Sequence, residues 1–148
     1  KRPDMTSALE WWRTVSSSTD AEELYNLGLN YLKLSDGTDA YYLAERLLAM
    51  AAKAGHLEAA LIHGRNTVSC RFSPSAGRGS NNLLKPFADK GHAEAAHLIG
   101  RWFASRPPFL TNYRRQAFRW FARAKELGVD TDADMKALEK WARRTYPK

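Results

Sequence analysis

Two six-residue stretches decide the fold: GHLEAA at residues 55–60 and GHAEAA at residues 91–96. They agree at five of six positions and lie 36 residues apart. Two series of glycines follow the same step, with one extra residue in the last interval: Gly28, Gly64, Gly100 and Gly55, Gly91, Gly128. Repetition at a fixed period of this length is the signature of stacked structural repeats. The sequence therefore predicts three units, near residues 20–55, 56–91 and 92–128.

Within each unit the apolar residues recur with helical spacing. Leu24, Leu27 and Tyr31 fall at i, i+3 and i+7, and the second halves of the units repeat such a stripe. Each unit is therefore predicted to be two antiparallel helices. The first glycine series lies within helices, where glycine costs about 1 kcal/mol relative to alanine, so we expect a neighbouring helix to pass close by. The second series ends helices, where a left-handed residue is favoured.

The flanking segments predict one further helix at each end of the chain, near residues 4–16 and 132–146. Between them, the Ser-, Gly- and Asn-rich residues 69–81 are expected to form a long loop, and Pro86 is expected to interrupt the second helix of the middle unit. The predicted fold is all-α: a right-handed α/α superhelix, or solenoid, of three helix pairs with a helix at each end, forming a single domain over residues 1–148.

The sequence resembles the Sel-one-like repeat family, which is related to the tetratricopeptide repeats. The resemblance rests on YNLGLNY at 25–31 and on AFRWFARA at 117–124 followed by Gly128. It implies that Trp120 and Phe121 are packed in the core. The middle unit departs from the pattern, because Thr67 replaces a tyrosine and its turn is expanded. The resemblance implies a non-catalytic scaffold whose first helices line a concave surface that holds another protein, and many bacterial members are exported.

Composition excludes several other classes of protein. The 148 residues are 44% hydrophobic and 26% charged, which indicates an ordinary globular chain. No stretch approaches the roughly 18 apolar residues of a membrane span, and Cys70 is the only cysteine. The chain starts at Lys1, so we expect that a signal peptide or another leading segment has been removed. A bacterial periplasmic or exported location is favoured, and the cytoplasm remains open.

No pattern of residues predicts catalysis, a cofactor or a metal site. His56 and His92 hold the same repeat position, so they should lie about 10 Å apart, too far for one zinc ion bound at about 2.0 Å. Cys70 lies beside Arg71 but has no recognisable catalytic partner, and no nucleophile-elbow or phosphate-loop motif is present. The sequence therefore predicts no enzyme, and an undiscovered hydrolase is kept as an alternative from another class.

Helical phase predicts a protein-binding surface on the concave side of the first helices. Its expected residues are Tyr25, Leu29, Leu61, Arg65, His97 and Arg101. The net charge of +7 is confined to residues 101–148, which hold 12 Lys and Arg against 5 Asp and Glu. In this region Arg115, Arg119 and Arg123 follow at i, i+4 and i+8 on one helical face, and we expect them to steer an acidic partner. Nucleic acid and a membrane surface are less favoured partners.

The function predicted from these features is a non-catalytic protein–protein interaction module. Three units are few for a scaffold of many partners, so a one-to-one binder is favoured, such as a bacterial inhibitor or immunity protein that neutralises a toxin or secreted effector. The alternative is a periplasmic adaptor in envelope assembly or secretion. An RNA-binding helical repeat is less favoured, because the repeats do not supply base-reading side chains at a fixed phase.

Overall fold

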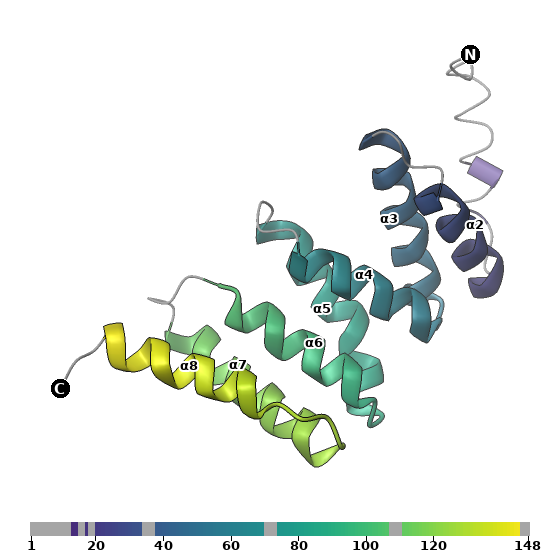
Figure 1. Cartoon of the computed structure of the whole chain (residues 1–148). Helices are drawn as coiled ribbons and strands as arrows, with labels where there is room; N and C mark the ends of the chain where they lie inside the picture. The colour runs from purple at the N-terminus through teal and green to yellow at the C-terminus, as the bar shows by residue number, and fades with distance from the viewer. Residues whose placement is uncertain are drawn as a thin grey trace. The chain divides into compact units, whose positions relative to one another are not determined.

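The computed structural model describes residues 13–14, 17, 20–33, 38–69, 74–106 and 111–145. This part of the chain forms seven α-helices and no strand, which confirms the all-α prediction (Figure 1). The helices are α2 (Ala21–Lys33), α3 (Thr38–Lys53), α4 (Leu57–Ser69), α5 (Pro74–Asp89), α6 (Ala93–Ala104), α7 (Thr111–Glu126) and α8 (Asp132–Thr145). The helix predicted at 4–16 and Cys70 lie outside the described residues, apart from helical residues 13 and 14. Contacts divide the chain into unit 1, residues 1–59, and unit 2, residues 60–148.

Helix α5 corrects two predictions about the middle of the chain. Residues 74–81 are helical rather than part of a loop, and the helix begins with Pro74, whose fixed φ suits a first helical position. The helix also continues through Pro86. Proline removes one hydrogen bond there, but its carbonyl still accepts from the Lys90 N–H at 3.2 Å. The buried side chains around it, which hold this part of α5 against the core, are Leu84, Phe87 and Ala88.

Three helices end as the second glycine series predicts. Gly55, Gly91 and Gly128 have φ values of 102°, 98° and 106°, in the left-handed region that favours glycine. At Gly91, the His92 N–H donates to the Phe87 carbonyl and the Gly91 N–H donates to the Ala88 carbonyl, both at 3.1 Å. The same two bonds follow α3 and α7. This is the Schellman arrangement, which pairs carbonyls that a helix end leaves free.

The first glycine series also lies where predicted, against a closely packed neighbour. An added Cβ would meet Leu48 at 3.1 Å from Gly28, Leu84 at 2.8 Å from Gly64, and Phe121 at 2.6 Å from Gly100. In each case the neighbour is a core side chain of the helix that follows. The predicted close approach is confirmed, and its cause is a large side chain filling the space that glycine leaves.

Each unit has its own buried centre. In unit 1 the stripe of α3 has no exposed area and packs with Leu24 and Gly28 of α2; it consists of Ala44, Leu47, Leu48 and Ala51. In unit 2, Ala117, Phe121 and Leu138 join α7 to α8. The buried Thr131 precedes α8 and donates its hydroxyl to the Phe121 carbonyl at 3.2 Å. This bond fixes the start of α8 against α7.

Candidate functional site

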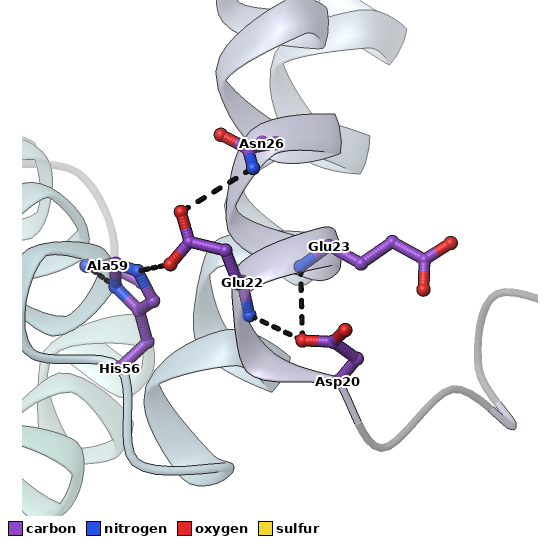
Figure 2. Close-up of polar contacts among 6 residues, drawn as sticks. All are labelled: Asp20, Glu22, Glu23, Asn26, His56 and Ala59. Atoms are coloured by element: carbon purple, nitrogen blue, oxygen red, sulfur yellow. Dashed lines mark hydrogen bonds and ion pairs between the residues drawn. The ribbon is translucent and has the colours of Figure 1, made fainter.

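The start of α2 is organised by side chains of unit 1. The Asp20 carboxylate accepts the N–H groups of Glu22 at 3.0 Å and Glu23 at 3.4 Å, which caps the helix (Figure 2). The Glu22 carboxylate then reaches across to His56, with Oε2 2.9 Å from Nε2. Glu22 is therefore held at one helix start and bound to the residue that precedes α4.

His56 is engaged through both ring nitrogens. Its Nδ1 accepts the Ala59 N–H at 3.2 Å, so Nε2 carries the proton that is donated to Glu22 (Figure 2). The ring of the predicted site residue Tyr25 stacks on it, with centroids 4.1 Å apart and planes at 23°. Tyr25 is half-buried, as is Leu29 on the next turn. In unit 1, Glu22 and Tyr25 therefore join α2 to His56, the residue before α4.

In unit 2 the predicted first-helix residues largely pair with carboxylates of neighbouring helices. Arg65 of α4 donates to Glu94 Oε1 of α6 through Nε at 2.9 Å and through Nη2. His97 of α6 contacts Asp134 of α8, with Nε2 and Oδ2 2.7 Å apart. Arg101 is exposed and makes no ion pair with the residues that the structure describes. Arg65 and His97 are therefore already bound to neighbouring carboxylates, whereas Arg101 has no such contact among the described residues.

The prediction that Leu61 lines an open surface is wrong. Its side chain is only 4% exposed and belongs to the core. The equivalent residues Tyr25 and His97 are half-buried. The repeat position therefore lies at the edge of the buried face, where the tyrosine and the histidine stay partly exposed and the leucine is buried.

A different surface of unit 2 is hollowed between α5 and α7. Two adjoining depressions of about 360 and 330 Å³ share Gln116 and Trp120, and together we call them the α5–α7 hollow. Its apolar lining consists of Ala88, Ile99, Phe103, Tyr113 and Trp120. Its polar lining consists of Asn81, Asn82, Lys85, Asp89, Asn112, Gln116, Arg119 and Arg123. Aromatic rings surrounded by amides and cations are the kind of lining that can bind another molecule.

The charges of the α5–α7 hollow are unequally paired. Lys85 contacts Asp89 at 2.6 Å, and Arg123 contacts Glu126 at 3.4 Å. Arg119 is exposed and has no ion pair within the described part of the chain. Within the described residues, the hollow therefore presents two cations that are already paired and one guanidinium, that of Arg119, that is not.

Most of the α5–α7 hollow is not predicted from the sequence. All three residues of the predicted steering row, Arg115, Arg119 and Arg123, are exposed on α7, but only the last two line the hollow. Trp120, which the repeat pattern assigns to the core, is instead half-buried in the hollow wall. Its spacing with Asn112 and Gln116, at i, i+4 and i+8, is the signal that could have indicated this surface.

Three negative findings bear on what these surfaces can do. Among the described residues, no group of three or more His, Cys, Asp or Glu side chains could hold a metal ion. None of the helices in the described ranges is both long and apolar enough to span a bilayer. Comparisons with protein-family models, with curated proteins and with solved structures find no match to this chain.

Proposed function

We propose that this protein is a non-catalytic module that binds one other protein and that the α5–α7 hollow is its binding surface. The observation that carries the proposal is the half-buried Trp120 beside the unpaired Arg119. Tryptophan and arginine are the residue types most enriched at the energetic centres of protein interfaces. An apolar centre with a polar rim is also the usual anatomy of such an interface.

The repeat pattern supports the same proposal. Three glycine-ended helix pairs at a period of about 36 residues fit a Sel-one-like repeat protein, stacked as a solenoid that presents surfaces for partners. The net charge of +7 favours an acidic partner, whose approach it would accelerate. The concrete role that we propose is an inhibitor or immunity protein of a toxin or secreted effector.

A second candidate surface is the first-helix face around Arg101. The observation that favours it is that Arg101 is exposed without an ion pair among the described residues. The neighbouring Arg65 and His97 already contact the carboxylates of Glu94 and Asp134, respectively. A partner at this face would have to break those pairs, whereas Arg119 is available at the hollow.

Affinity capture from the native organism with quantitative mass spectrometry tests the function and the surface together. Three baits are compared: the natural chain, Arg119→Glu, and the matched charge reversal Lys140→Glu on α8. We expect one protein, bound at a 1:1 ratio, to be retained by the natural and Lys140→Glu baits and lost from Arg119→Glu. Equal retention of the partner by all three baits would show that the binding surface lies outside the α5–α7 hollow. Capture of an RNA, or of no protein at a stoichiometric ratio, would refute the proposed function.

A further inference from the structure

We infer that the α5–α7 hollow binds an extended peptide segment of its partner, in which carboxylates flank an apolar or aromatic side chain. The inference deepens the proposed function and rests on it. It depends on the spacing of the amides in the hollow, on the position of the unpaired guanidinium, and on one buried acceptor without a partner.

The amides of α7 are spaced for an extended backbone. Asn112, Gln116 and Trp120 are successive i+4 positions that line the hollow, and four helical residues advance about 6 Å. In an extended peptide, residues that point the same way recur about every 6.6 Å. A side-chain amide both donates and accepts hydrogen bonds, as a peptide group does. A strand running along α7 would therefore meet Asn112 and Gln116 with backbone groups in register and place a side chain against Trp120.

The opposite wall supplies a related set of groups. Asn81 and Lys85 on α5 also lie four residues apart and line the same depression. The Asn81 Oδ1 atom is buried and has no hydrogen-bond partner among the described residues. A buried acceptor without a donor is unfavourable. Rotation of this amide toward a backbone N–H in the hollow would supply the missing bond.

The cations of the α5–α7 hollow favour carboxylates on either side of the apolar residue of the peptide. Arg119 is available to form a bidentate pair with an incoming carboxylate. Lys85 and Arg123 are held only by exposed pairs with Asp89 and Glu126, and such pairs contribute little, so they can exchange partners. A nucleic-acid strand fits less well, because a phosphate at every nucleotide needs a row of unpaired cations, and among the described cations of the hollow only Arg119 lacks an ion pair.

A peptide-display selection tests this inference before the partner is identified. The probe is a random library of about 12-residue peptides, selected on the immobilised natural chain, and enriched peptides are then synthesised. We expect an excess of Asp and Glu around an aromatic or aliphatic residue. Binding measured by fluorescence polarisation should weaken about 10-fold or more in Arg119→Glu, as for the loss of a charge-assisted hydrogen bond, and less than about 2-fold in Lys140→Glu, as for a solvated surface charge.

Nuclear magnetic resonance then locates the peptide. Shift changes should concentrate on α5 and α7, and Gln116→Ala should weaken binding several-fold while circular dichroism stays unchanged. Peptides without an acidic excess, equal binding to Arg119→Glu, or shifts confined to α6 and α8 would overturn the inference. Preferential binding of a 12-nucleotide oligothymidylate through Arg119 would overturn it as well. If the captured partner depends on Arg119 but lacks such a segment, this inference fails and the proposed function stands.

Discussion

Gly100→Ala should destabilise unit 2, although alanine is the better helix former. The added Cβ would lie 2.6 Å from Cδ1 and 2.7 Å from Cε1 of Phe121, a rigid ring that is 1% exposed. Helix propensity favours alanine by about 1 kcal/mol, and overpacking a filled core costs about 1–3 kcal/mol. Because two ring atoms are too close and the ring has little room, we expect a net loss of about 1–2 kcal/mol in the free energy of unfolding.

Urea denaturation followed by far-UV circular dichroism measures this loss, and Gly64→Ala is the matched control in the same unit. There the nearest atom is the terminal Cδ1 of Leu84 at 2.8 Å, which can rotate away, so propensity and packing should nearly cancel. Phe121→Leu should relieve the clash, giving a coupling of about 1 kcal/mol in a double-mutant cycle with Gly100→Ala. A Gly100→Ala variant at least as stable as Gly64→Ala, or a coupling of zero, would refute the packing argument.

Four other substitutions test three separate features. Gly91→Ala should lower the free energy of unfolding, measured by urea denaturation, by about 1–2 kcal/mol, because φ is 98° there. Gly79→Ala in α5, where an added Cβ has no neighbour within 4 Å, should raise it by about 0.5–1 kcal/mol. Equal effects of the two substitutions would contradict the argument that Gly91 is required to end its helix. Lys125, 2.6 Å from Asp132, lowers the pKa of that carboxyl below its ordinary value of 3.8. The stabilisation is therefore present above pH 3.8 and lost as the pH falls through the lower folded pKa, and Lys125→Met should flatten this acid dependence slightly in melts from pH 6 to 2. Arg101→Ala should change the affinity for the captured partner less than about 2-fold by surface plasmon resonance, whereas a loss of about 10-fold would place the partner on the first-helix face.

The helix ends and the close contacts at glycine could be predicted from sequence because both are local demands. The left-handed conformation of the residue after Ala54 and after Lys90 costs little free energy because that residue is glycine. Inside a helix, glycine is less favourable than alanine, so its presence there indicates a requirement of packing. Both predictions were strengthened because glycine recurs at the equivalent position of all three units. The size of the neighbour, such as Phe121 against Gly100, still had to come from the structure.

The site was predicted less well, because exposure depends on neighbours that are distant in sequence. Leu61 shares a repeat position with Tyr25 and His97, yet it is buried while they are only half-buried. Trp120 holds a position expected in the core, yet it lines the hollow. Residues 74–81 have the composition of a loop, yet they are helical. They form the first half of α5, whose second half carries the buried side chains Leu84 and Phe87.

The sequence by itself determined that this chain is helical, where its helix pairs end, and which face is apolar in helices such as α2 and α3. These properties follow from backbone conformation and from spacing within a few residues. The tertiary structure alone decided that Arg65 and His97 are held by Glu94 and Asp134, and that Arg119 is left beside an open hollow. The reason is that pairing and concavity depend on how neighbouring helices approach one another, and side chains far apart in the sequence set that approach.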